Sequence, residues 1–414
     1  MQTDIFTARR NLLRTLITLG AGTALSGCSE SSTVGRLTSF GVSKHLGEGP
    51  TDMRPWARYP EKNDLIMLAD RPPLLETPIR YFMSDRTPNE AYFVRWHYAG
   101  LPIHIDLRTF RLNVIGAVSK PLQLSFNDLV TKFEPVNAVV FSQCAGNSRS
   151  FFRPQVPGAE WTNGAMGNAQ YKGVRLKDVL KMAGVSSKAV EASFRGLDEP
   201  PLQSSPHFEK PLTIEHAMDG DAFIAYEMNG APMPMLNGFP IRLVVPGWFA
   251  TYWVKALSQI TVRTEPLDNF WVNTAYRVPI TPDHSEDPAH PSERTKPLTT
   301  YPTRAVFVTP DGSAKVHKLV TTTIEGIAVD DGSGIRRVEV STDGGRNWSD
   351  AKLDAVIDKY SWRRWRLDWT PPRTGNYSLQ CRATNASGQT QPDREWNHGG
   401  YARRMIQTLD VEVV

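Results

Sequence analysis

A cysteine beside a turn is the residue of this chain best placed to do chemistry. Cys144 follows the apolar run 138–141 and precedes the turn-forming residues 145–148, so its thiol is expected at a strand end, where sites on α/β scaffolds are commonly built. As a thiolate it could bind a metal or act as a hydrolase nucleophile, although no matching histidine signature is present. It could also be an inert core thiol, or form a disulfide with Cys381.

Cysteine count and net charge exclude several classes of protein. The 414 residues include three cysteines, with no C-x-x-C-H motif for covalent haem, no C-x-x-C pair for zinc and too few thiolates for an iron–sulfur cluster. A formal charge of +4, from 47 basic and 43 acidic residues, is too dilute for nucleic-acid binding. With 40% hydrophobic and 22% charged residues, the chain is globular and long enough for two or three domains.

Residues 1–28 have the features of a bacterial export signal. Arg9 and Arg10 precede an apolar stretch that ends at Leu25 and is too short to cross a bilayer about 30 Å thick. The paired arginines resemble a twin-arginine signal, a route that passes folded proteins with their cofactors. The segment ends Leu-Ser-Gly-Cys, like a lipobox, so Cys28 is either lipidated or lost by ordinary cleavage. Both alternatives predict a periplasmic protein, tethered to the membrane in the first case.

Further polar and aromatic residues recur at intervals through the middle of the chain. Arg95 and His97 are two residues apart, which places them on one face of a strand, as expected also of any half-exposed strand. Arg242 interrupts a run of Ile, Leu and Val, where a lone arginine more often binds a buried anion than forms a surface ion pair. Asp198 follows Gly196-Leu197, and Lys255 follows Trp253-Val254.

Taken in order with Cys144, these residues resemble the sulfite oxidase family of molybdopterin enzymes over about 87–414. The resemblance implies a molybdenum ion held by the dithiolene of a pterin and by the thiolate of Cys144, a soft ligand suited to that metal. The pterin phosphate calls for cationic and hydrogen-bonding partners. By resemblance the cofactor-binding residues are Phe93, Val94, Arg95, Trp96, His97, Asp198, Asn237, Arg242, Trp253, Val254 and Lys255.

The resemblance also implies an active site for a small oxyanion. Arg149 matches the family's substrate arginine, and Arg95 adds a second positive charge, so that a doubly charged sulfite would be neutralised. Tyr276 matches the active-site tyrosine, although it could also be an ordinary aromatic at a loop edge. Two positions depart from the vertebrate pattern: Asn237 replaces a pterin-contacting histidine, and Tyr171 stands where a tryptophan often lines the pocket.

The implied activity is a sulfite dehydrogenase that oxidises sulfite to sulfate. With no haem motif or haem domain in the chain, the electrons are expected to pass singly to an external c-type cytochrome. One alternative is an enzyme of the same fold acting on sulfane sulfur, a sulfoxide or nitrate. The other is a non-catalytic lipoprotein with an immunoglobulin-like binding module and a Cys144–Cys381 disulfide.

The elements that must position these residues are predicted as an α+β domain followed by an all-β domain. Residues 29–86 are polar, without sustained periodicity, and are expected to form a tether and an arm. A catalytic domain is expected over 87–285 and an immunoglobulin-like sandwich over 286–414. Predicted strands lie at 92–94, 112–116, 138–141, 241–245, 338–341 and 377–383, and predicted helices at 124–132 and 175–183.

The sandwich is also expected to mediate a homodimer. Trp348, Trp362, Trp365 and Trp369 would supply apolar area for the interface, unless the core takes them up. Cys381 alternates with outward-facing residues beside Tyr377 and is therefore predicted to be a core thiol.

Overall fold

The computed structural model describes residues 56–414, except 58, 60, 64 and 313–314. The expected export signal, the lipobox and Cys28 therefore lie outside the described residues. Among the helices that are described, none is long and apolar enough to cross a membrane.

The arm that precedes residue 87 contains strands that the sequence, without sustained periodicity in this part, did not predict. The strands β1 (Trp56–Ala57), β2 (Leu65–Ala69) and β3 (Leu74–Glu76) form an antiparallel sheet with β4 (Val94–Arg95). Leu65 and Leu75 are fully buried and pack with Val94 and Trp96. Strands this short show too few alternations for periodicity to reveal them. Pairing of Leu74 with Arg95 anchors the strand on which a predicted site residue lies.

Two larger sheets build the catalytic region, which is mostly strands with few helices. The first has the order β10-β9-β14-β5-β6, with β14 and β5 parallel and the other pairs antiparallel. Its strands are β5 (Leu112–Gly116), β6 (Leu122–Leu124), β9 (Glu191–Gly196), β10 (Glu209–Thr213) and β14 (Leu257–Arg263). The second has the order β12-β11-β8-β7, and β13 pairs with β11. Its strands are β7 (Pro135–Gln143), β8 (Met166–Arg175), β11 (Phe223–Met228), β12 (Ala231–Pro232) and β13 (Arg242–Val244).

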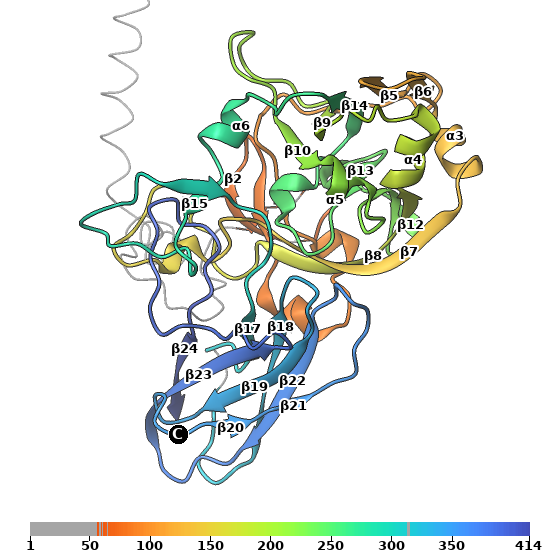
Figure 1. Ribbon diagram of the computed structural model, residues 1–414. Coiled ribbons are helices and arrows are strands. Elements are labelled where there is room, and N and C mark those ends of the chain that lie inside the picture. Colours follow the sequence, from red (N-terminus) through yellow and green to blue (C-terminus); the bar gives the residue numbers. More distant parts are fainter. Residues whose placement is uncertain (1–55, 58, 60, 64, 313–314) are drawn as a thin grey trace, which may run out of the picture. The chain divides into compact units, whose positions relative to one another are not determined.

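Short helices connect these strands (Figure 1). The two predicted helices are confirmed as α3 (Phe126–Thr131) and α4 (Leu176–Ala183). Ser125 and Asp128 form the expected capping box at the start of α3. The other α-helices of the described residues are α5 (Ile214–Met218) and α6 (Phe270–Asn273). Single turns of 3₁₀ helix occur at η1 (Ile79–Met83), η2 (Asn89–Ala91), η3 (Arg149–Phe151), η4 (Met235–Asn237) and η5 (Ala250–Tyr252).

The C-terminal region is an all-β domain of two four-stranded antiparallel sheets, drawn in blue in Figure 1. The sheet orders are β17-β18-β22-β21 and β20-β19-β23-β24. The strands are β17 (Arg304–Thr309), β18 (Thr322–Val329), β19 (Ile335–Ser341), β20 (Ser349–Asp350), β21 (Lys352–Leu353), β22 (Arg363–Trp369), β23 (Gly375–Asn385) and β24 (Gln407–Val413). Apolar side chains from both sheets share one core. An immunoglobulin-type connectivity stays a prediction.

The buried residues of this domain correct two expectations. Cys381 is a fully buried core thiol, as predicted, and it forms no disulfide with Cys144, so that alternative is wrong. Trp362, Trp365 and Trp369 are also buried in the cores, which removes most of the apolar area that was expected to support a dimer interface.

A hairpin crosses the predicted domain boundary at 285/286. It is formed by β15 (Arg277–Pro279) and β16 (Thr295–Pro297), which pair antiparallel. The catalytic core likewise continues into the C-terminal region, because Val306, Ile327 and Trp362 belong to the same buried cluster as the catalytic strands. The all-β domain thus shares apolar contacts with the catalytic region.

Candidate active site

Cys144 lies directly after β7, at the strand end that the sequence predicted. Its backbone N–H donates to Ala165 O at 2.9 Å, and its carbonyl accepts from Asn147 N–H at 3.0 Å, which closes the turn around the thiol. The residue is 8% exposed. A tight, hydrogen-bonded turn therefore holds the sulfur at a fixed place between two cavities.

The inner pocket is the cavity on one side of this thiol. Most of the residues predicted to contact a cofactor line it. The lining residues are Tyr92, Phe93, Arg95, Trp96, His97, Cys144, Ala145, Asp198, Phe208, Asn237, Arg242, Ala250, Thr251, Trp253, Lys255 and Tyr276. Val94 and Val254 are the predicted cofactor-binding residues that do not line it, and both are buried in the cores instead. Side chains from segments far apart in the sequence thus converge on one pocket.

Cationic side chains dominate the inner pocket, and their own hydrogen bonds are incomplete. Arg242 donates from Nη1 to Asn237 O at 3.0 Å and from Nη2 to Trp253 O at 3.3 Å, whereas its buried Nε has no partner. Arg95 Nη1 and Thr251 Oγ1 are also buried without a partner. A buried polar atom without a partner is costly, so these atoms indicate a hydrogen-bonding ligand. The residues fit an anionic group such as the pterin phosphate.

Lys255 and Asp198 add a buried pair of opposite charge. Lys255 Nζ donates to Arg95 O at 2.6 Å and lies 4.6 Å from the centre of the Trp96 ring. Burial, together with Arg242, lowers the pKa of Lys255 to about 7. Burial also raises the pKa of Asp198, against the opposing effect of Lys255. The pocket thus holds more basic than acidic side chains, and all of them are poorly solvated.

His97 and Tyr276 meet where the inner pocket reaches the thiol. The Tyr276 hydroxyl lies 2.6 Å from His97 Nε2, and the His97 ring stacks on Phe208. Burial, and then Arg95 and two lysines, hold the pKa of His97 well below its usual value, so the ring is neutral. With its proton on Nε2, the ring donates to the Tyr276 oxygen and leaves the Tyr276 O–H to donate elsewhere. Burial raises the pKa of Tyr276, which keeps its hydroxyl protonated. The tyrosine is therefore a fixed hydrogen-bond donor beside the sulfur.

A buried lysine from the N-terminal arm supports Asn237, at the position where the family pattern differs. Lys62 Nζ donates to Asn89 O at 2.6 Å, Tyr92 O at 3.2 Å and Asn237 Oδ1 at 2.5 Å. Asn237 Nδ2 in turn donates to Phe93 O at 3.1 Å. Lys62 is 6% exposed, and burial lowers its pKa to about 7. The amide is thus fixed on both sides by the chain itself.

The outer cavity, with a volume of about 360 Å³, adjoins the inner pocket at Cys144. Arg95, Cys144 and Tyr276 line both cavities. The other residues of the outer cavity are Leu74, Gly146, Arg149, Pro157, Gly158, Ala159, Trp161, His398, Gly399 and Tyr401. The three predicted catalytic residues, Arg95, Arg149 and Tyr276, are therefore brought together here.

Arg149 is held against a backbone that only glycine can provide. Its Nε donates to Gly400 O at 3.3 Å, and its Nη2 donates to Gly399 O at 3.2 Å. A Cβ atom at Gly158 or Gly400 would lie 2.6 Å or 2.8 Å from the guanidinium, and both glycines have positive φ. The guanidinium also lies 5.0 Å from the centre of the Tyr401 ring. The arginine is thus fixed in position and faces the cavity.

Sequence reasoning missed several residues of the site and misplaced one. Tyr171 is fully buried and lines neither cavity; it donates a hydrogen bond to Tyr92 from behind the pocket, so the expectation that it lines the pocket is wrong. Trp161 lines the outer cavity, although no motif or periodicity around it indicated this. Lys210, buried over Tyr276, had a usable signal, because it shares a face of β10 with the buried Leu212.

Family comparisons agree with this geometry. Residues 98–271 match the family model described as oxidoreductase molybdopterin binding domain. Residues 295–407 match the one described as Mo-co oxidoreductase dimerisation domain. The first match covers the region that contains most of the inner pocket. The second match covers the all-β region.

Whole-chain comparisons cover both regions together. The mitochondrial sulfite oxidase of Mus musculus is 32% identical over 379 residues, which is 87% of this chain and 68% of that protein. The sulfite oxidase of Arabidopsis thaliana is 28% identical, with 85% of this chain and 94% of that protein covered. The crystal structure of the sulfane dehydrogenase SoxCD from Paracoccus pantotrophus superposes with a TM-score of 0.72 at 25% identity, covering 94% and 92% of the two chains.

Proposed function

Because the chain belongs to the sulfite oxidase family of molybdopterin oxidoreductases, we propose that it is a sulfite dehydrogenase. The observation that carries the proposal is the place of Cys144, whose thiol lies between a cationic inner pocket and an outer cavity with Arg95 and Arg149. The first fits the anionic pterin cofactor and the second fits a small oxyanion. The reaction converts sulfite and water to sulfate, two protons and two electrons.

Each group of the site has a part in this proposal. Cys144 would hold the molybdenum, and the cofactor, when bound, supplies the two-electron chemistry. Arg95, Arg242 and Lys255 would bind the anionic part of the pterin. Arg149 and Arg95 neutralise and orient the dianionic substrate in the outer cavity. The Tyr276 hydroxyl donates to whichever acceptor lies beside the sulfur, and His97 Nε2 holds it in place.

Turnover with two different electron acceptors tests the proposal. The loaded protein is expected to oxidise sulfite with ferricyanide and, separately, with a c-type cytochrome that takes one electron per molecule. Failure with both acceptors would overturn the assignment as a sulfite-oxidising enzyme. Turnover with ferricyanide alone would contradict only the cytochrome partner.

A sulfane-sulfur dehydrogenase is the second candidate of the same fold. It is favoured by the whole-chain likeness to SoxCD and by an outer cavity of about 360 Å³, which is larger than a four-atom anion requires. Comparing kcat/KM for sulfite with that for a persulfide decides between the two, and a higher value for the persulfide would replace the first proposal. Nitrate and a sulfoxide serve as the remaining substrates to compare.

We further propose that the protein is exported to the periplasm by the twin-arginine route and forms a homodimer. The paired arginines at positions 9 and 10 support the first point, and the family match of residues 295–407 supports the second. An Arg9→Lys/Arg10→Lys variant should remain in the cytoplasm, and cell fractionation measures this. Sedimentation as a monomer at micromolar concentration would contradict the dimer.

The buried lysines predict how pH affects the stability of the cofactor-free protein. The pKa values of Lys62, Lys210 and Lys255 are lowered to about 7, mainly by burial, whereas an unfolded lysine titrates near 10.4. Below pH 7 both states are protonated and the folded state carries the full cost of the buried charges. Between pH 7 and about 10 only the folded state loses these protons, so its free energy of unfolding rises with pH.

Binding of an anionic cofactor should raise these pKa values, and the free energy of unfolding should then no longer rise between pH 7 and 9. We therefore expect Tm of the cofactor-free protein to rise between pH 7 and 9 relative to Tm of the loaded protein. Lys255→Met should reduce this rise in Tm relative to the loaded protein. Lys188→Met, at an exposed position, should leave the rise unchanged. Equal pH slopes for the two forms would contradict the prediction.

A further inference from the structure

His398 is a basic residue at the outer cavity to which the proposed function assigns no role. It lines the cavity together with Arg149 and Tyr401, and its side chain is 46% exposed. It also precedes Gly399 and Gly400, whose carbonyls accept the hydrogen bonds of the Arg149 guanidinium. A side chain at position 398 is therefore next to the group that would bind the substrate anion.

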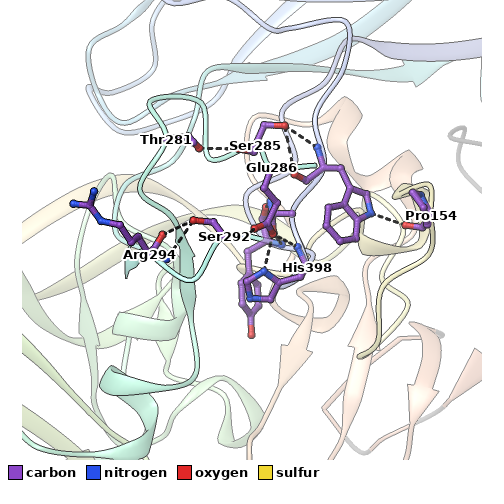
Figure 2. Close-up of polar contacts among 10 residues, drawn as sticks. Pro154, Thr281, Ser285, Glu286, Ser292, Arg294 and His398 are labelled. Carbon is purple, nitrogen blue, oxygen red and sulfur yellow. Dashed lines mark hydrogen bonds and ion pairs between the residues drawn. The ribbon is translucent and has the colours of Figure 1, made fainter. Parts of the chain in front are cut away.

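A buried carboxylate fixes His398 in place (Figure 2). Glu286 Oε1 accepts hydrogen bonds from the backbone N–H of His398 and from its ring Nδ1, both at 2.6 Å. Glu286 Oε2 accepts from Ser292 N–H at 2.6 Å. The Glu286 side chain is only 3% exposed. Three N–H donors thus satisfy the carboxylate, and the ring is oriented with Nδ1–H toward it.

Neighbouring loops hold the same segment. Trp396 Nε1 donates to Pro154 O at 2.7 Å, and Glu286 N–H donates to Trp396 O at 2.8 Å. Ala402 N–H donates to Ala145 O at 3.0 Å, next to Cys144. Hydrogen bonds therefore connect the loop that carries His398 to the loop of Glu286, to the loop after Arg149 and to the turn that contains Cys144.

The second ring nitrogen of His398 is available to a ligand. Among the described residues, none forms a hydrogen bond with Nε2. The charged or titratable groups around the ring are Glu286 and, across the cavity, Arg149, Arg95, Tyr276, Tyr401 and Cys144. In the described part of the chain, no acidic side chain lines this cavity. An anion would therefore meet Nε2 on the same side as two guanidinium groups.

We propose that His398, oriented by Glu286, is a third basic contact for the oxyanion in the outer cavity. Because Nδ1–H already faces a carboxylate, an anion receives a hydrogen bond from Nε2 only when the ring carries both protons. Anion binding therefore selects the protonated ring, and affinity falls as the solution becomes more basic. This inference rests on the proposed function, since it assigns a further residue to the same cavity.

Binding of inorganic sulfate, the product anion, tests the inference without turnover. Isothermal titration of the loaded full-length protein should show the sulfate Kd rising about tenfold from pH 6 to pH 8, the size of one charge-assisted hydrogen bond. The His398→Gln variant should bind sulfate about tenfold more weakly at pH 6, and its sulfate Kd should change little with pH. His398→Arg should keep tight binding at both pH values, and Glu286→Gln should weaken binding at pH 6.

A matched control separates this role from other titrations. Lys255 at the inner pocket also titrates near pH 7 in the cofactor-free protein, so the loaded protein is used and the decisive comparison is His398→Arg with the unmodified protein. His290 pairs with Asp287 at 3.1 Å on the same loop as Glu286 but does not line the cavity, so His290→Gln should bind like the unmodified protein. Thermal unfolding checks that every variant is folded.

Two results would overturn the inference: tight sulfate binding by His398→Gln at pH 6, or the same pH dependence in His398→Arg as in the unmodified protein. In steady-state assays, KM for sulfite should follow the sulfate Kd while kcat changes little. If the protein does not turn over sulfite but its sulfate binding still depends on His398, the proposed function is overturned and the anion contact is retained.

Discussion

Replacing Cys144 with alanine is expected to abolish sulfite oxidation and to release molybdenum from the purified protein. Loss of residues that merely orient a metal ligand commonly costs 10- to 100-fold in affinity or activity, and removal of the ligand itself should cost more than about 100-fold in kcat. The measurements are metal content per chain and turnover with ferricyanide.

Cys381 provides the matched control for this substitution. It is also a buried cysteine, but it lies in the core of the all-β domain. Cys381→Ala should keep metal and turnover, and lower the free energy of unfolding by about 1 kcal/mol because of the small cavity it leaves. Full metal content in Cys144→Ala would show that this thiolate is not the ligand.

Replacing Arg149 with glutamine is expected to raise KM for sulfite by about 100-fold while the molybdenum content stays unchanged. The guanidinium lines the outer cavity but not the inner pocket, so substrate binding should suffer and cofactor binding should not. A hydrogen bond to a charged group contributes about 1.5–3 kcal/mol, and about 2.7 kcal/mol corresponds to 100-fold. Steady-state kinetics and metal analysis of the same preparation check both parts.

Arg153→Gln is the control for this prediction. Arg153 is an exposed arginine four residues away, whose Nη1 donates to the carbonyls of Ser150 and Phe152. It lines neither cavity, so its loss should leave KM unchanged. Loss of molybdenum in Arg149→Gln would contradict the separation of the two cavities.

Local patterns predicted the elements well where they are long enough to show a period. The strand at 112–116 and the helix capped by Ser125 follow from residues close in sequence. The strands β2 and β3 have five and three residues, and their burial depends on partners such as Trp96 that no local pattern reveals. Short strands were thus missed because tertiary contacts stabilise them.

Site residues were predictable where they lie near Cys144 in sequence or match the ordered family pattern. Asn237 and Arg242 entered the site as expected. Lys62 and His398 were missed because neither lies in an apolar run or a motif, and their roles arise from contacts across 175 and 112 residues. Such contacts are a property of the folded chain and leave no trace in local composition.

The fixed position of Arg149 has a consequence for biosynthesis. The carbonyl groups that hold its guanidinium are separated from it by about 250 residues, so a growing chain contains the arginine long before its acceptors exist. Because chains are made from the N-terminus and domains form as their residues emerge, the catalytic sheets can fold while the substrate cavity is still unfinished. A nascent protein can therefore be nearly complete and still have no assembled binding place for its substrate.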